Sequence, residues 1–102
     1  MLYAMIGFEI ELKLSATKDM DRLRAYDAAM VADGIEAHLS HNPTKENKSR
    51  IKRLRGISNP DYRLRLGNYR VFYKVDEAKH TVDVLRVLHK DQTHRYYEGV
   101  QR

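Results

Sequence analysis

Residues 61–75 read DYRLRLGNYRVFYKV, which predicts a β-hairpin around the two-residue turn Gly67-Asn68. A two-residue loop fixes the register of its two strands. The register therefore predicts four cross-strand pairs, namely Leu66–Tyr69, Arg65–Arg70, Leu64–Val71 and Arg63–Phe72.

The hairpin is expected to have one apolar and one basic face, because successive side chains of a strand point to opposite sides. The apolar face is predicted to contain Leu64, Leu66, Tyr69, Val71, Tyr73 and Val75. The other face is predicted to contain Arg63, Arg65, Arg70, Phe72 and Lys74. Like charges placed directly opposite each other destabilise a strand pair. The Arg65–Arg70 pair therefore indicates a surface that binds an anion.

The positive charge of the chain is concentrated in its middle third. Residues 1–44 hold four Lys/Arg and seven Asp/Glu, residues 45–74 hold ten and two, and residues 75–102 hold five of each. The net charge of +5 thus arises from residues 45–74. Such a distribution is typical of proteins that bind polyanions, although a basic surface that is merely solvated is the commoner case.

Length and composition favour a single domain over residues 1–102. The absence of cysteine excludes disulfides and is compatible with a cytoplasmic protein. No apolar run approaches the roughly 18 residues of a membrane span, so no membrane association is expected. The opening MLYAMIGF lacks the basic region and cleavage site of a signal peptide, and either Met1 or Met5 could be the start.

The remaining elements predict an α+β fold. Alternation over residues 6–14 predicts a half-buried strand, and Ser15 is expected to be the N-cap of the helix that follows. Residues 16–25 and 26–40 predict two helices or one bent helix with a break near Tyr26. Residues 50–56 predict a short strand, residues 81–88 a strand inside the sheet, and the tail from His89 a final helical turn. We therefore expect two layers, with the helical pair on an antiparallel sheet of three to four strands and the arginine face open.

Phosphate chemistry fits these residues better than other chemistries. His38 and His41 lack a third ligand at a matching spacing, so neither a metal nor another cofactor is predicted. No cysteine nucleophile and no glycine-rich phosphate loop are present. Arginine stabilises a phosphate well but is a poor base, because it keeps its proton at neutral pH. The proton would have to move through another side chain.

Two groups of candidate site residues follow. The residues expected to act in catalysis are Arg63, Arg65, Arg70, Lys90, Tyr96 and His89, with His94 as a further candidate base. Histidine titrates near neutral pH, whereas Tyr96 would need a pKa lowered by nearby arginines to act as a base. The residues expected to bind RNA or phosphate are Lys52, Arg53, Arg55, Phe72 and Lys74, with Tyr96 and Tyr97 able to stack on bases. Tyr62, Tyr69 and Tyr73 are instead expected to belong to the core.

Four segments together resemble the RelE/ParE toxin family of bacterial toxin–antitoxin pairs. They are KRLRG at 52–56, YRLRLGNYRVFYKV at 62–75, VLRVLHK at 84–90 and the late Tyr96. The resemblance implies a compact α+β toxin that a cognate antitoxin wraps and neutralises, as a hetero-oligomer. RelE-like members cleave mRNA in the ribosomal A site without a metal, using basic residues and a late tyrosine.

The resemblance places Arg63 and Arg65 on the strand before the turn, where RelE-like enzymes have two basic residues. Arg70 matches the arginine after the turn, Lys90 a position usually held by arginine, and Tyr96 the C-terminal tyrosine. Active RelE-like enzymes often have lysine where this chain has Arg63 and Arg65, which moves the role of base toward His89, His94 or Tyr96.

Two other functions stay open at this point. ParE-like relatives share the fold but inhibit DNA gyrase, and the hairpin pattern does not separate them from ribonucleases. A basic module that binds nucleic acid without catalysis also fits the charge of residues 45–74. Retention of the basic residues together with a late tyrosine favours the ribonuclease.

Overall fold

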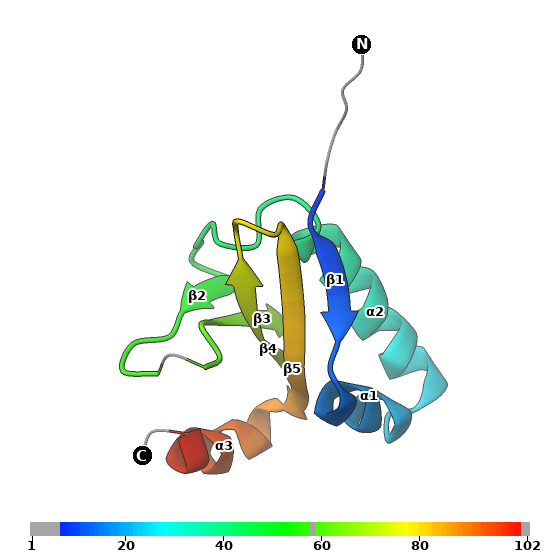
Figure 1. Ribbon diagram of the computed structural model, residues 1–102. Coiled ribbons are helices and arrows are strands. Elements are labelled where there is room, and N and C mark those ends of the chain that lie inside the picture. The colour runs from blue at the N-terminus through cyan, green and yellow to red at the C-terminus, as the bar shows by residue number, and fades with distance from the viewer. Residues whose placement is uncertain (1–6, 58, 101–102) are drawn as a thin grey trace.

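The computed structural model describes residues 7–57 and 59–100. Its elements follow the order shown in Figure 1: β1 (Glu9–Leu12), α1 (Leu14–Asp21), α2 (Ala25–Leu39), β2 (Ile51–Arg53), β3 (Tyr62–Leu66), β4 (Tyr69–Asp76), β5 (Thr81–His89), the 3-10 turn η1 (Lys90–Gln92) and α3 (Thr93–Val100). The α+β class is confirmed. Ile6 of the predicted first strand, Ser58 of the turn before the hairpin and residues 101–102 of the tail lie outside the described residues.

The sheet has five strands in the order β1-β5-β4-β3-β2. All four predicted cross-strand pairs of the hairpin are confirmed. β5 lies between β4 and β1, as its two apolar faces predicted. The strands β2 to β5 form the predicted antiparallel sheet of three to four strands, and the predicted N-terminal strand β1 joins its edge in parallel to β5.

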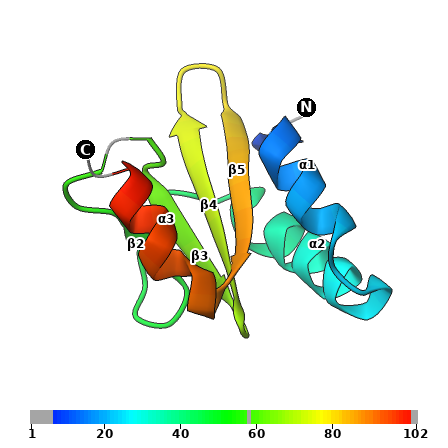
Figure 2. The same cartoon turned by 90° about the horizontal axis from the view of Figure 1, so that it is seen from below.

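The helices lie on both faces of the sheet. Figure 2 shows α1 and α2 on one side of the strands and α3 on the other. We call the face toward α1 and α2 the inner face and the face toward α3 the outer face. The inner face holds the main core, which includes Val31, Ile35, Leu39, Leu64, Val71, Tyr73, Val82 and Val84. The structure therefore has a third layer, the short helix α3, in addition to the two predicted layers.

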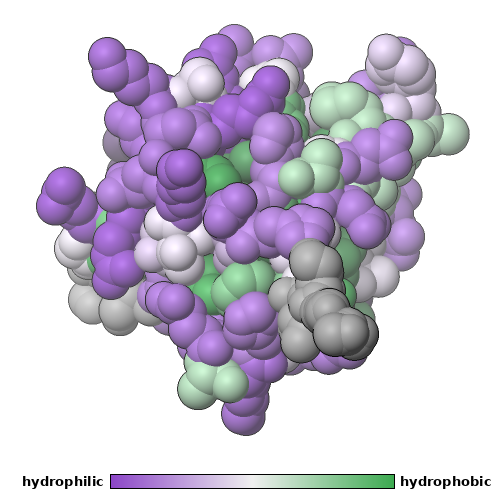
Figure 3. Space-filling model, turned by 90° about the horizontal axis from the view of Figure 1, so that it is seen from above, coloured by the Kyte–Doolittle hydropathy of each residue, from purple (hydrophilic) through white to green (hydrophobic). Residues whose placement is uncertain are grey.

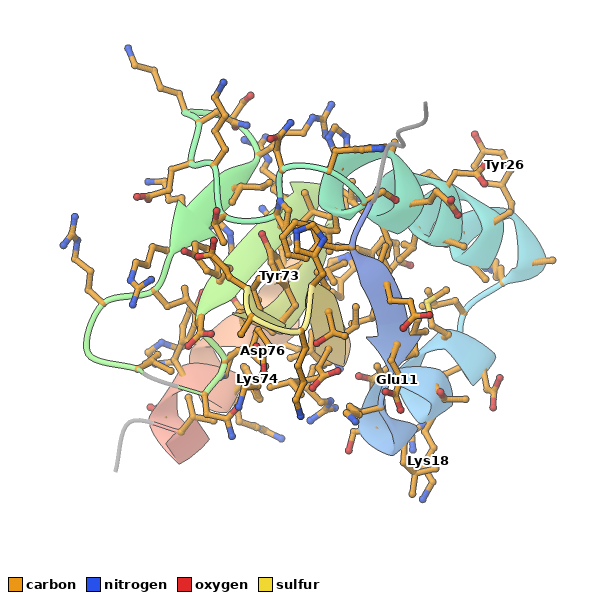
Figure 4. All side chains as sticks on the ribbon, turned by 45° about the horizontal axis from the view of Figure 1, so that its top comes forward. Glu11, Lys18, Tyr26, Tyr73, Lys74 and Asp76 are labelled. Carbon is orange, nitrogen blue, oxygen red and sulfur yellow. The ribbon has the colours of Figure 1, made fainter. Side chains whose placement is uncertain are left out.

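The tyrosines expected in the core lie there. Tyr62 and Tyr73 are buried and stack with ring centroids 5.5 Å apart, and the Tyr73 hydroxyl donates to the Pro43 carbonyl at 2.6 Å. Tyr69 is half-buried and its hydroxyl donates to the Asp27 carboxylate on α2 at 3.0 Å. In Figure 4 the ring of Tyr73 lies among the strands, whereas Tyr26 points away from α2 into solvent.

The helical pair differs from its prediction at two positions. The N-cap of α1 is Lys13 and not Ser15, which lies inside the helix. The break falls at residues 22–24, just before Tyr26, where the backbone at Arg24 is extended. Lys13 makes no side-chain capping bond, since its ammonium group has no acceptor, and its own N–H pairs with the Val84 carbonyl of β5 at 2.9 Å. Pairing with the sheet thus sets the start of the helix.

Gly34 lets α2 approach the hairpin closely. A Cβ at this position would lie 2.6 Å from one methyl carbon of the buried Leu66 and 2.7 Å from the other. A glycine inside a helix costs about 1 kcal/mol relative to alanine. Glycine is nevertheless required at this position, because any side chain would push α2 away from β3.

We expect Gly34→Ala to destabilise the protein, since overpacking typically costs about 1–3 kcal/mol and outweighs the gain in helix propensity. Urea unfolding measures the change. Gly99→Ala in α3 is the matched control, because a Cβ there meets nothing within 4 Å and should be neutral or stabilising. Equal effects of the two substitutions would contradict this account of Gly34.

A β-bulge interrupts the pairing of β4 with β5. Phe72 and Tyr73 are adjacent on β4, but their partners on β5 are Arg86 and Val84, which leaves Leu85 as the extra residue. A bulge of this kind re-aims the side chains that follow it. Val84 and Val87 both face the inner core as a result, and Arg86 turns to the outer face.

One side of the protein has a mostly polar surface. The side seen from above in Figure 3 is largely hydrophilic, with small hydrophobic areas between charged side chains. The large apolar side chains most exposed among the described residues are Leu14 and Tyr26. Within the described part of the chain, no helix is long and apolar enough to cross a membrane.

Candidate functional site on the outer face

Three arginines of the hairpin form the centre of the site, and we call Arg63, Arg65 and Arg70 the arginine cluster. Arg65 and Arg70 are direct cross-strand partners, and Arg63 faces Phe72. The Arg70 Nη1 donates to the carbonyls of Gly67 and Tyr69, at 2.8 and 3.0 Å. The hairpin turn therefore fixes the position of this guanidinium group.

The electrostatics of the arginine cluster favour a bound anion. Burial lowers the pKa of Arg70 below its ordinary value, and the charges of Arg63 and Arg65 lower it further. The Nε of Arg63 is buried and has no hydrogen-bond partner among the described residues. A buried donor without a partner costs free energy. An anion near these groups would relieve the repulsion among the three guanidinium groups.

The outer face is not as open as predicted. Phe72 is completely buried, because Tyr96 and Tyr97 of α3 pack on its ring with centroid distances of 4.7 and 5.6 Å. The predicted role of Phe72 in stacking on RNA bases is therefore not supported, because the rings of Tyr96 and Tyr97 cover it. Tyr96 and Tyr97 are half-buried and remain as rings that a base can contact.

A cavity of about 420 Å³ lies between β5 and α3, next to this aromatic group. Its lining combines cationic, amide, aromatic and apolar side chains: Arg86, Leu88, Gln92, Arg95, Tyr96, Gly99 and Val100. Such a mixture suits a nucleotide, which has a flat ring and an anionic group.

Tyr96 has an environment opposite to the one its predicted role as a base requires. Burial raises the pKa of its phenol above the ordinary value, and this effect outweighs the lowering by Arg86. The phenol therefore keeps its proton at neutral pH. It is suited to donate a proton and not to accept one.

The histidines do not join the arginine cluster. His89 pairs with Tyr69 and lies on the inner face, where the two rings meet edge to face at 5.7 Å. Its Nδ1 accepts from the Asp91 N–H at 3.1 Å and thereby caps η1. His94 is exposed on α3 beside Glu98, at 3.2 Å. The structure thus gives His89 a structural role and does not support His89 as a base beside the arginines.

Lys90 lies near the end of the hairpin. Its backbone N–H donates to the Asn68 carbonyl of the turn at 2.7 Å, and its side chain is exposed. The contact fixes the start of η1 and α3 relative to the hairpin. Lys90 is thus available at the edge of the outer face.

The other predicted phosphate-binding residues are scattered. Lys52 pairs with Arg63 and extends the arginine cluster across β2. Arg53 lies on the inner side, where its guanidinium is 5.5 Å from the Tyr62 ring centroid and donates to the Tyr62 hydroxyl. Arg55 is exposed in the loop after β2. Lys74 lies in a separate polar groove that includes Glu11 and Asp83, and these carboxylates would repel an anion there (Figure 4).

Sequence reasoning missed Arg86 and its partner. Arg86 faces Phe72 across the strands, and Asp19 of α1 holds it with two hydrogen bonds, at 2.7 and 3.0 Å. A signal was present, because a single arginine within the apolar strand TVDVLRVL must find a partner or reach the surface. Asp19 could not be chosen as that partner from the sequence, since the contact depends on how α1 lies against β5.

Comparison with known proteins identifies the family. Residues 10–94 match the model of the ParE toxin of the type II toxin–antitoxin system parDE. The toxins RelE and RelG of Mycobacterium tuberculosis are 25% and 27% identical to this chain over 88 residues. Both matches cover 86% of this chain. They cover 87% of the length of RelE and 97% of the length of RelG.

Solved structures give the same result. The chain resembles the toxin–antitoxin complex RelBE2 of Mycobacterium tuberculosis with a TM-score of 0.68 and 27% identity, over 82% of this chain and 99% of the matched one. It also resembles a free E. coli RelE toxin in which two arginines are replaced by alanine. The TM-score is 0.68 and the identity 25%, and the match covers 94% of this chain and 97% of the E. coli toxin. Fold, sequence and family model agree, and the chain therefore belongs to the RelE/ParE family of toxins from type II toxin–antitoxin systems.

Proposed function

We propose that this toxin is an endoribonuclease that cuts mRNA on the ribosome, in the cytoplasm, and so inhibits translation. The main observation in support is the arginine cluster, which lies on the same face as the protonated phenol of Tyr96. The relatives named RelE add support by family likeness.

The proposed reaction uses the ribose next to the cut. The 2′-hydroxyl gives its proton to solvent water as its oxygen attacks the phosphorus, the bond from phosphorus to the 5′-oxygen breaks, and a 2′,3′-cyclic phosphate and a 5′-hydroxyl result. Arg63, Arg65 and Arg70 stabilise the extra negative charge on the phosphate oxygens. Tyr96 supplies the proton to the leaving 5′-oxygen, since its raised pKa keeps the phenol protonated until that step. The phenol regains its proton from solvent afterwards.

We propose an antitoxin as the protein partner, in a hetero-oligomer. Similar solved structures are complexes of RelE-type toxins with RelB-type antitoxins. An acidic antitoxin segment would satisfy the same arginines that otherwise bind RNA, so inhibition and substrate binding would compete for one surface.

Mapping mRNA 5′ ends after induction of the toxin tests the proposal. We expect new 5′-hydroxyl ends inside coding regions, at a fixed position within codons, and their loss when translation is blocked. Growth arrest without such cuts would reject the ribonuclease.

The second candidate is a gyrase inhibitor, which the match to the ParE toxin model favours. It predicts double-strand breaks and filamentous cells on induction, and inhibition of supercoiling by purified gyrase. Normal supercoiling in the presence of excess toxin would remove this candidate.

A further inference from the structure

Asp19 is a buried carboxylate with three hydrogen bonds to β5. Only 6% of the residue is exposed. Its Oδ2 accepts from the Arg86 Nε at 2.7 Å and from the Val87 N–H at 2.9 Å, and its Oδ1 accepts from the Arg86 Nη2 at 3.0 Å. β1 pairs with β5 only as far as Val84, so Asp19 also satisfies an edge amide beyond the end of β1.

Arg86 connects this carboxylate to the proposed acid. The bulge at Leu85 turns Arg86 to the outer face, and its guanidinium lies 5.8 Å from the centroid of the Tyr96 ring. Tyr96 in turn packs on Phe72. A chain of contacts therefore runs from Asp19 of α1 through the Arg86 guanidinium group to the ring of Tyr96.

Stability alone is a weak reason for this arrangement. Removing a carboxylate and a guanidinium from water is costly, and apolar residues of similar volume often hold such positions equally well or better. A guanidinium held at a fixed place under a tyrosine has a further effect, because its charge acts on the phenol.

We propose that Asp19 and Arg86 are positioning residues that fix the place and the proton affinity of Tyr96, so that it acts as the acid of the cleavage reaction. The inference rests on the proposed ribonuclease function. Asp19 holds the guanidinium, and the guanidinium together with Phe72 holds the ring.

The two residues act on the phenol in opposite directions. The Arg86 charge lowers the pKa of Tyr96, whereas Asp19 and the neighbouring Tyr97 raise it, and Arg95 lines the adjoining cavity. Asp19→Asn keeps the side-chain shape but leaves the Arg86 charge without its counter-ion, so the pKa of Tyr96 should fall. Arg86→Met removes the cation, so the pKa should rise. If the Asp19–Arg86 pair only stabilised the fold, both variants would be less stable, but the pKa of Tyr96 would not shift in opposite directions.

The experiment combines NMR titration with cleavage of mRNA on purified ribosomes. Tyrosine labelled with ¹³C at Cζ reports the protonation of Tyr96, assigned by comparison with Tyr96→Phe, over the pH range in which circular dichroism shows a folded protein. We expect opposite pKa shifts in Asp19→Asn and Arg86→Met, and cleavage at least about tenfold slower in both. Arg86→Lys, which keeps the charge but cannot make the two-pronged contact, should also slow cleavage about tenfold with less change in the titration.

Each outcome decides the inference. Opposite shifts with slower cleavage support it, and shifts in the same direction or no shifts overturn it. Variants that titrate as expected but cleave as fast as the unchanged toxin also overturn it. If the unchanged toxin does not cleave, the proposed function fails first, and the role of Asp19 in that reaction falls with it. Should Asp19→Asn not fold, Arg86→Met and Arg86→Lys still distinguish charge from contact geometry.

Discussion

Replacing Arg70 with alanine is expected to abolish toxicity while the protein stays folded. Arg70 lies in the centre of the arginine cluster, and its guanidinium is held by the Gly67 and Tyr69 carbonyls. Loss of one preorganised donor to a reacting phosphate typically lowers a rate by about 10²- to 10³-fold. Colony formation on induction and the rate of mRNA cleavage by the purified variant measure the effect.

Lys48→Ala is the matched control for Arg70→Ala. It removes the same charge from an exposed position in the linker before β2, outside the hairpin. Its toxicity should remain close to that of the unchanged toxin. If Arg70→Ala stays toxic, or if both variants lose activity equally, the arginine cluster is not the functional surface and net charge alone matters.

Replacing Leu64 with alanine is expected to act on stability instead and to destabilise the protein strongly. Leu64 is completely buried, and its cross-strand partners Ile51 and Val71 are buried beside it. A buried leucine replaced by alanine costs about 2–5 kcal/mol, which is a large part of the 5–15 kcal/mol typical of a domain. A lower urea midpoint with an unchanged slope would show the loss of stability.

Leu14→Ala provides the comparison for Leu64→Ala. Leu14 begins α1 and is 70% exposed, so its truncation should change the free energy of unfolding by no more than about 0.5 kcal/mol. Similar losses in both variants would mean that the inner face of β3 is not the main core.

The parts of the fold that were predictable are those set by local patterns. The hairpin register followed from a two-residue turn, and the inward side chains of β3 and β4 followed from it. The helical pair followed from apolar spacing, although Lys13 replaced Ser15 as the cap because pairing with β5 determines where α1 starts. Family likeness was recognisable from the hairpin and the strand after it, and the family model confirms it.

The rest depended on contacts between distant segments. α3 is a full helix and not a final turn, and its tyrosines cover Phe72 on the face that was expected to be open. Side-chain alternation could not place His89 correctly, since one extra residue in β5 changes which face it occupies. The link between Asp19 and Arg86 joins residues 67 positions apart. The roles of the arginine cluster, Lys90 and Tyr96 stay predictions.

The bulge in β5 has a consequence for tolerance to mutation along the strand. Before Leu85, the even-numbered Val82 and Val84 face the core, and after it the odd-numbered Val87 does. The parity of positions that reject charged residues therefore reverses at Leu85. Deleting that single residue would leave Arg86 opposite Phe72 and Val87 opposite Val71, so the faces of both would be kept. If Leu85 were instead retained and paired with Phe72, Arg86 would move opposite Val71 and its guanidinium would enter the core. The outer face therefore depends on Leu85 staying outside the ladder.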